Sequence, residues 1–380
     1  MSLDDIQLAI QGMARQFAQE RLWPGAEDRD RESRFPRAEL TEMGALGFLG
    51  MLVPEAYGGM DSDNVSYATV IEEIAASDGA CSTILSVHSS VACVPIAKYG
   101  TDTQKQTYLP KLASGEWIGG FALTEPQAGS DAANLRTTAV RDGEYYVLNG
   151  AKQFITSGKN AGLIIVFAVT DKGAGKKGIS AFIVETDTPG YEVVRVEEKL
   201  GINASDTCQL SFTDMMVPAE NLLGEEGEGY KIALANLEGG RIGIASQAVG
   251  MARKSLELAR DYAAQRHAFG GPIANQQGVS FKLAEMATEV EAARQLVRLA
   301  ANCKDEGLPC LKEASMAKLF ASEMAERVCS SAIQIMGGYG YLKDYPVERI
   351  YRDVRICQIY EGTSEIQKLV IARDLMRDAG

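Results

Sequence analysis

The chain has 380 residues, of which 46% are hydrophobic and 23% charged, as expected for a folded globular protein of two or three domains. Its formal net charge of −13 argues against nucleic-acid binding, because an acidic surface repels phosphate groups. The seven cysteines form no CxxC pair and the two histidines lack ligand spacing, so we expect no metal site and a reducing, cytoplasmic environment.

The first part of the chain is predicted to be helical. Between Ile6 and Phe17, apolar residues recur every three or four positions, which is the stripe of an amphipathic helix. Residues 67–98 predict two further apolar helices. The start of the chain lacks the segments of a signal peptide, and no apolar run reaches the roughly 20 residues of a membrane helix. We therefore expect an N-terminal helical domain over residues 1–114 and no association with a membrane.

Near Trp117 the pattern changes to short β-rich runs separated by turn signals. These runs are Tyr145–Leu148, Gly162–Val169, Ile179–Glu185, Tyr191–Val196 and Cys208–Phe212. They predict an antiparallel β domain over residues 115–220. Residues 173–178 match the letters of the GxGxxG dinucleotide motif, but a β-rich run follows them where that motif needs a helix. A hairpin loop is therefore the favoured interpretation.

After Pro218 the helical pattern returns. Long periodic stretches run over about Tyr230–Gln265, Gln277–Glu306, Leu311–Met336 and Ser364–Asp378. Helices of this length bury their apolar faces best in an antiparallel four-helix bundle, which we assign to residues 221–380. The predicted fold class is α+β, with helical domains on either side of a β domain.

Two segments at predicted strand ends could contact a flat cofactor. In residues 121–131, FALTEPQAGSD, a strand runs into a turn of small residues. Its backbone N–H groups and the hydroxyls of Thr124 and Ser130 can approach a polar ring or a phosphate, although the turn could equally be structural. Phe154 could stack on a ring, but an aromatic residue in a strand is more often part of a core.

Three helix ends carry residues suited to a ligand or to catalysis. Arg266 can bind a pyrophosphate through its planar fork, or can simply be favoured by the helix dipole. The glycines of residues 334–341 could approach a ligand or form an ordinary C-cap. Glu361 follows an apolar run and would be a base near neutral pH if it is buried. Otherwise it is an ordinary acid beside a helix that Thr363 or Ser364 caps.

In their order and spacing, the segments TEPQAGSD, FITSG, RHAFGxPIxxxQ, QIMGGYGYL and IYEGTSEIQ resemble motifs of the acyl-CoA dehydrogenase family. The similarity covers about residues 5–378, and ANLEGGRIGIASQAVG is closest to the short-chain, butyryl-CoA-type or short branched-chain type. This resemblance implies an FAD-dependent oxidoreductase that converts a short straight or branched acyl-CoA into the trans-2-enoyl-CoA.

The resemblance also implies which residues bind FAD. Those expected beside the flavin, the diphosphate or the adenosine are Phe121, Leu123, Thr124, Gly129, Ser130, Phe154, Ile155, Thr156, Gln334, Gly338, Thr363, Ser364 and Glu365. Those expected to reach the FAD of a neighbouring subunit are Arg266, Phe269, Gln276 and Gln277. The implied assembly is a homotetramer, a dimer of dimers, with FAD held across the dimer interface.

By the same resemblance, Glu361 takes the α-proton while flavin N5 accepts the β-hydride. Ser130, Glu238, Arg241 and Gly362 would contact the acyl-CoA substrate. Two residues depart from the common pattern: Phe154 stands where many relatives have Trp, and Glu238 where many have Asp. Other branches place the base at the position of Gly240, which cannot act as one here.

Electrons would then pass to an electron-transferring flavoprotein, in fatty-acid or branched-chain amino-acid catabolism. An acyl-CoA oxidase or a flavin monooxygenase on the same scaffold is the alternative enzyme. The non-enzyme alternative is a flavin-bearing nucleic-acid-binding relative, but this chain lacks the basic cluster that such a protein would need.

We expect the acyl tail to lie between two sets of aliphatic residues that limit it to about C4–C5. They are Ile84, Leu85, Val87 and Val91 on one side and Leu234 and Leu237 on the other.

Overall fold

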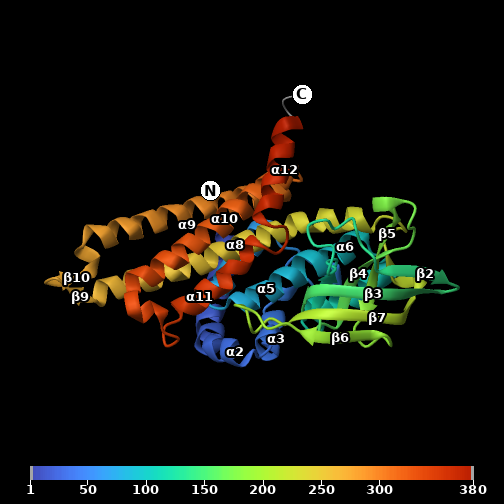
Figure 1. Cartoon of the computed structure of the whole chain (residues 1–380), viewed down its shortest axis with the longest axis horizontal. Coiled ribbons are helices and arrows are strands. Elements are labelled where there is room, and N and C mark those ends of the chain that lie inside the picture. The colour runs from blue at the N-terminus through green and yellow to red at the C-terminus, as the bar shows by residue number, and fades with distance from the viewer. Residues whose placement is uncertain (1–2, 378–380) are drawn as a thin grey trace.

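The computed structural model describes residues 3–377, in which the sheet comes between two helical regions in chain order and lies at one end of the molecule, beside the helices of both regions (Figure 1). The N-terminal region consists of α1 (Asp5–Phe17), α2 (Ala26–Glu32), α3 (Arg37–Ala45), α4 (Asn64–Ala75), α5 (Gly79–Val87), the π-helical turn η5 (His88–Cys93), α6 (Val94–Tyr99) and α7 (Asp102–Ala113). The run Gly79–Tyr99 is long and apolar enough to cross a bilayer, but 89% of its apolar window is buried, as in a core helix.

The central sheet contains the five strands that the sequence predicts and three more. They are β1 (Gly119–Ala122), β2 (Thr138–Asp142), β3 (Tyr145–Thr156), β4 (Leu163–Val169), β5 (Ile179–Glu185), β6 (Tyr191–Val196), β7 (Thr207–Pro218) and β8 (Leu222–Leu223). The strand order is β6-β7-β3-β2-β4-β5-β8, and β1 pairs with β4. The sheet is not purely antiparallel as expected, because β1 and β2 both meet β4 in parallel. Residues 173–178 join the antiparallel strands β4 and β5, which confirms the hairpin loop.

The C-terminal region is built on three long helices. It comprises α8 (Gly229–Gln265), the short hairpin β9 (His267–Ala268) and β10 (Gly271–Pro272), α9 (Gln277–Asp305), α10 (Leu311–Met336), α11 (Val347–Val354), η10 (Arg355–Gln358) and α12 (Ser364–Arg377). The expected four-helix bundle differs in one member. The last helix, α12, packs against α10 near its start and then projects from the body, while α4 packs against α8 and α9 (Figure 1).

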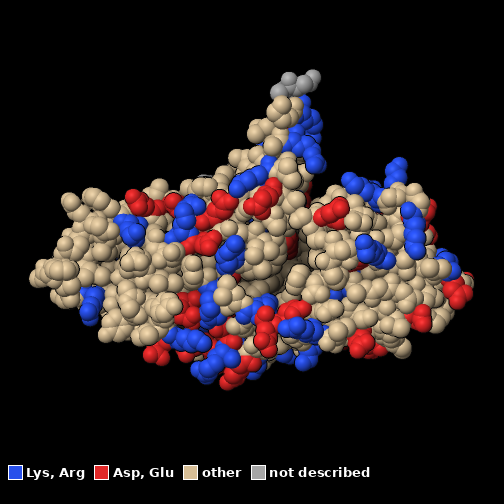
Figure 2. Space-filling view, viewed as in Figure 1, with Lys and Arg blue, Asp and Glu red and all other residues tan. Residues whose placement is uncertain are grey.

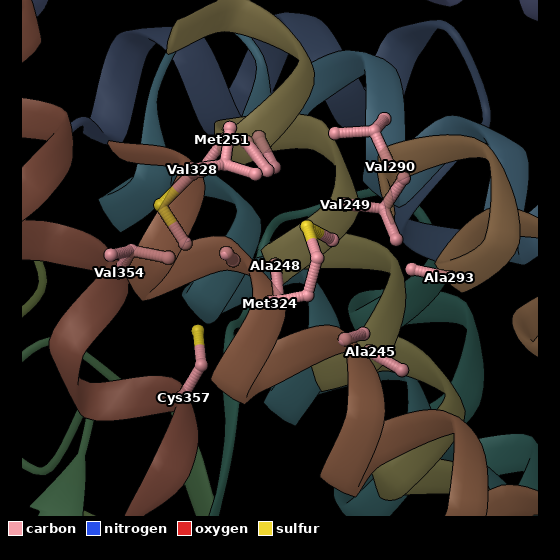
Figure 3. Close-up of a cluster of buried hydrophobic side chains, with 14 of the residues drawn as sticks. Ala245, Ala248, Val249, Met251, Val290, Ala293, Met324, Val328, Val354 and Cys357 are labelled. Atoms are coloured by element: carbon pink, nitrogen blue, oxygen red, sulfur yellow. The ribbon is translucent and has the colours of Figure 1, made fainter. Parts of the chain in front are cut away.

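Small and flexible side chains allow the three long helices to approach closely. Ala245, Ala248 and Val249 of α8 face Met324 and Val328 of α10 in one buried cluster, which α9 and α11 complete (Figure 3). Burying a Val or Met side chain stabilises the fold by about 1.5–3 kcal/mol. This core fixes α8 as a rigid axis, on which the functional residues described below are placed.

The end of α9 also holds the start of α4. The Asp305 carboxylate accepts hydrogen bonds from the backbone N–H groups of Asn64 (2.7 Å) and Val65 (3.2 Å), while Asp63 caps the same helix from its own chain position. Two carboxylates at one helix N-terminus satisfy its free donors and complement its dipole. The N-terminal and C-terminal helical regions are therefore joined at a defined register.

Candidate active site

Glu361 lies in a tight turn between η10 and α12. Its φ is +53° and that of Gly362 is +92°, so two successive residues adopt the left-handed conformation that most side chains disfavour. Buried donors hold this turn. The Gln367 amide donates to the carbonyl oxygens of Glu361 (3.3 Å) and Gly362 (2.9 Å), and Lys318 Nζ donates to the carbonyl of Gly362 (2.6 Å).

The Glu361 carboxylate points at α8. A Cβ atom placed on Gly240 would lie only 1.7 Å from Glu361 Oε2, so any other residue at this position would require the Glu361 side chain to move. Glu361 Oε2 is buried and has no hydrogen-bond partner among residues 3–377. A buried acceptor left free by the fold is available to a ligand that fills the space beside it.

Burial raises the pKa of Glu361 to about 7, against the opposing effect of the positive charges of Lys318 and Arg241. A carboxylate with this pKa exists in both forms near neutral pH, which suits a general base. Glu361 as a whole is half-buried and its Oε2 atom is buried, which agrees with the expectation of a partly buried carboxylate rather than with that of an ordinary acid at a helix N-terminus.

Arg241 lies on α8 next to Gly240 and is buried, with 6% of its surface exposed. In the part of the chain that the structure describes, its Nε and Nη1 atoms have no hydrogen-bond partner. Burial lowers the pKa of Arg241, while Glu361 and Glu238 raise it. Glu238 accepts a hydrogen bond from the Cys310 thiol (3.0 Å). A buried guanidinium with two free donors beside a free carboxylate is suited to a polar ligand.

A buried ion pair that the sequence did not predict stabilises the turn after β1. Lys152 Nζ lies 2.9 Å from Glu125 Oε1 and donates to the carbonyl of Leu123 (3.1 Å). The backbone N–H groups of Arg136 and Thr137 also donate to Glu125. Although burial alone would raise it, Lys152 and these donors hold the pKa of Glu125 at about 2. The turn that carries Thr124 and Ser130 is therefore rigid.

The next strand presents an aromatic ring to solvent. Phe154 sits at a bulge of β3 with φ +59° and is 64% exposed, so the expectation that such a residue belongs to the core is wrong. Thr156 is half-buried, whereas the side chains of Ile155 and Leu123 lie in the core. Those two residues can meet a ligand through their backbone alone. Phe121 packs on Phe167 at a centroid distance of 4.8 Å.

The remaining expected cofactor residues form two groups. Thr363, Ser364 and Glu365 follow the Glu361 turn, where Thr363 Oγ1 accepts from the Ile366 N–H (3.4 Å) and therefore caps α12. The other group lies at the far end of α8 and α10. It comprises Arg266, Phe269, Gln276, Gln277, Gln334 and Gly338.

A surface pocket of about 520 Å³ lies at this far end. Arg266, Gly338 and Tyr339 line it together, and the Arg266 guanidinium lies 5.8 Å from the centre of the Tyr339 ring. Phe269 stands beside it with 94% of its surface exposed. Arg266 follows Gly240 by about 26 residues of helix, which corresponds to roughly 39 Å at 1.5 Å per residue. This pocket is therefore remote from Glu361 of the same chain.

Family models agree with this fold. The N-terminal, middle and C-terminal domain models of acyl-CoA dehydrogenases match residues 4–116, 120–215 and 227–376. An acyl-CoA dehydrogenase of Bacillus subtilis is 52% identical over 376 residues, covering 99% of each chain. The chain belongs to the acyl-CoA dehydrogenase family. The mitochondrial short-chain specific acyl-CoA dehydrogenase of Rattus norvegicus is 48% identical, covering 99% of this chain and 92% of its own length.

Solved structures of acyl-CoA dehydrogenases give the same picture. Butyryl-CoA dehydrogenase from Megasphaera elsdenii is 45% identical with a TM-score of 0.97, over 99% of both chains. A chain in a structure titled for the electron transferring flavoprotein of Acidaminococcus fermentans is 47% identical with a TM-score of 0.98, also over 99% of both. The chain is accordingly an acyl-CoA dehydrogenase flavoprotein that is similar to short-chain members of the family, and its fold class is confirmed.

Acyl-CoA dehydrogenases depend on FAD, and the residues of this chain fit that cofactor. The exposed Phe154 ring offers a stacking surface next to Ser157, whose buried hydroxyl has no partner within the protein. At the far pocket, the space beside Gly338 is open, with no atom within 4 Å of a Cβ built there. Arg266 supplies a positive charge at the same pocket. The side chains present thus offer an aromatic face for a ring and a cation for a diphosphate.

Proposed function

We propose that this acyl-CoA dehydrogenase removes the α-proton of a short acyl-CoA with Glu361 and that the product is the trans-2-enoyl-CoA. The observation that carries this proposal is the buried Glu361 carboxylate, which has a free oxygen and a pKa of about 7. A carboxylate in solution is too weak a base for this reaction at neutral pH, and burial corrects that. Figure 2 shows the surface hollowed between the base of α12 and the sheet domain, on the side where a substrate would enter.

In the reaction, ionised Glu361 takes the proton from the α-carbon and the C–H electron pair forms the new α,β double bond. FAD, when bound, supplies the acceptor for the hydride that leaves the β-carbon. The thioester oxygen gains negative charge as the α-proton leaves, and fixed N–H donors stabilise it best in a dry site. The backbone N–H of Glu361 is such a donor, because the Gly362 turn is locked by Lys318 and Gln367.

The free donors of Arg241 would hold the CoA part of the substrate, which gives an acidic protein the local positive charge that an anionic ligand needs. Ser130 on the rigid turn after β1, Glu238 and Gly362 would complete these contacts. Bound CoA would in turn neutralise the buried guanidinium. Substrate binding is therefore expected to be weakened most by loss of Arg241.

We further propose that the flavin site is shared between subunits of a homotetramer, a dimer of dimers. Phe121, Thr124, Phe154 and the residues that follow Glu361 would bind FAD in their own subunit. The pocket of Arg266 and Gly338 lies too far along α8 to reach the same cofactor, so it would serve the FAD of a neighbouring subunit. The exposed apolar residues of α12 are consistent with burial between subunits, since Leu369, Leu375 and Met376 are 58%, 57% and 71% exposed.

The structure changes the expected lining of the acyl pocket. Ile84 and Leu85 are fully buried in the N-terminal core, because that face of α5 packs against the first helices of the chain. The face of α5 and η5 toward α8 is polar instead. There Thr83 accepts from Gln247 (2.6 Å), Gln247 also accepts from the Tyr360 hydroxyl, and Ser86 Oγ lies 2.3 Å from a Cβ built on Gly243. A hydrogen-bonded floor close to Glu361 favours a short acyl chain of about C4–C5.

Turnover of a series of straight and α-methyl-branched acyl-CoAs tests this proposal. The rate constant kcat/KM should peak near C4–C5 and fall steeply by C8, since the first methylene that does not fit must disturb a packed floor. We expect electrons to pass to an electron-transferring flavoprotein in the cytoplasm, so turnover should need that acceptor. Turnover with oxygen alone would indicate an oxidase, and a rate still rising at octanoyl-CoA would contradict the short pocket.

A further inference from the structure

We infer that Lys318 is a positioning residue for the catalytic base: from α10, its ammonium group anchors the turn that carries Glu361 and places a buried positive charge beside the carboxylate. This inference rests on the proposed role of Glu361. Lys318 has no exposed surface, and its Nζ donates to the carbonyl oxygen of Gly362 at 2.6 Å. The turn it holds contains two successive left-handed residues.

The hydrogen bond from Lys318 to the Gly362 carbonyl does not by itself explain why residue 318 is a lysine. The carbonyl of Gly362 already accepts from the Gln367 amide at 2.9 Å, so it would stay paired without Lys318. Burying an ammonium group is costly, and a methionine would fill the same space without that cost. The charge itself is therefore the feature that distinguishes lysine, and Glu361 is a carboxylate that the charge can act on.

Other groups around the base leave this role to Lys318. Arg241 is the second cation that favours ionised Glu361, but its two unpaired donors are the ones proposed to bind the substrate. The other titratable groups near the turn are three neutral side chains with raised pKa values and one exposed carboxylate at the start of α12, and none of them carries a positive charge. They are Tyr67 of α4, Cys357 of η10, Tyr360 beside the base, and Glu365. Burial lowers the pKa of Lys318 to about 8, so it is still charged where Glu361 ionises.

The test is the holoenzyme with Lys318→Met, assayed by α-deuterium exchange. The probe is an acyl-CoA analogue in which sulfur replaces the β-carbon, because it has α-hydrogens but no β-hydride to lose. Exchange into D₂O, followed by mass spectrometry, then reports proton removal alone. The exchange rate rises with pH as Glu361 ionises. Loss of the neighbouring positive charge should raise the pKa of Glu361 and so move this rising limb of the pH profile to higher pH by roughly one unit. Exchange at roughly one unit below the wild-type midpoint should therefore fall about tenfold.

The melting temperature separates this role from a structural one. Below the pKa of Glu361, where that carboxyl is neutral, removing the buried charge should leave the melting temperature unchanged or higher, whereas loss of a structural anchor lowers the melting temperature and leaves the limb in place. That second outcome would overturn the inference. Lys368→Met is the matched control, since Lys368 is an exposed lysine of α12 paired with Glu323, and it should move neither quantity.

Two further variants keep the inference open to refutation. If Lys318→Met does not fold, Lys318→Gln must show the same displaced limb, and an unmoved limb in it refutes the role. Loss of exchange in Glu361→Gln together with an unmoved limb in the lysine variants would leave the proposed function standing and remove this inference. Exchange that persists in Glu361→Gln would instead remove the proposed function.

Discussion

Glu361 combines two properties that oppose each other, burial and charge. Its pKa is about 7 in the folded protein and 4.5 for an ordinary glutamate. Between these values the native state binds more protons than the unfolded state, so the stability that this group contributes is present below about pH 4.5 and is lost as the pH rises through 7. The folded protein thus holds at neutral pH a charge that weakens it.

Glu361→Gln should therefore stabilise the holoenzyme at alkaline pH. We expect a gain on the order of 1–3 kcal/mol above the pKa of Glu361 and almost none near the pKa of an ordinary glutamate. Urea unfolding at the two pH values measures it. Glu365→Gln is the control, because nearby hydrogen bonds lower the pKa of that exposed residue and its loss should bring no alkaline gain. Equal gains at both pH values would mean that Glu361 is not titrating as described.

Gly240 permits a direct exchange of the base between two elements. Because a Cβ at this position would overlap Glu361 Oε2, Gly240→Glu alone should disturb the turn and abolish activity. The double change Gly240→Glu, Glu361→Gly should regain part of it, since a carboxylate from α8 then occupies the vacated space. Steady-state turnover of butyryl-CoA measures the recovery. A double variant no more active than Gly240→Glu would show that the two positions do not share one site.

At the scale of single residues, the sequence predicted those that sit in recognisable motifs. Glu361, Arg241 and Thr363 were identified in this way, and the structure brings the first two together. Lys318 was not, because it lies within a helical pattern and acts on a turn that belongs to another element, and Gln367 was not singled out although it closes the IYEGTSEIQ segment. An isolated lysine in a helical pattern is predicted to be exposed, and only the packing of α10 shows that Lys318 is buried.

At the scale of elements, the turn after β1 depends on a strand that follows it. Glu125→Ala would leave Lys152 buried without its partner and should cost about 3–5 kcal/mol of stability. FAD binding should weaken in parallel, because the turn that carries Thr124 and Ser130 loses the ion pair that holds it. The control is Glu42→Ala, which breaks an exposed pair with Arg21 and should cost less than about 1 kcal/mol. Chemical unfolding compares the two, and equal losses would contradict a special role for the buried pair.

Helix and strand positions followed closely from sequence periodicity where the pattern was long. The bounds of α10 agree with the prediction, and those of α8 and β6 agree to within a residue. The strand β2 was not predicted, because Thr138–Asp142 has too few apolar residues to show alternation. The direction of α12 was not predictable either. Three of its apolar residues, Leu369, Leu375 and Met376, are exposed and do not indicate which way the helix lies.

At the scale of the whole molecule, the proposal of a flavin site shared between subunits predicts how mixed oligomers behave. Arg266→Ala alone should weaken FAD binding and the tetramer together, and Arg266→Lys should rescue only partly because it lacks the planar fork. Subunits carrying Arg266→Ala and Glu361→Gln should each be inactive. Co-assembled, they should regain activity, because one site then combines Glu361 of the first with Arg266 of the second. Separately purified and mixed homotetramers serve as the control, and no recovery in the co-assembled protein would contradict sharing.

The most direct test of the account is the anaerobic reaction of the FAD-loaded protein with butyryl-CoA, followed by flavin absorbance. The wild type should bleach rapidly. Glu361→Gln should bind the same amount of FAD and butyryl-CoA but bleach at least roughly 10²–10⁴ times more slowly, the usual effect of losing a general base. A yellow, substrate-binding Glu361→Gln variant that keeps more than about a tenth of the wild-type rate would contradict the assignment of Glu361 as the base.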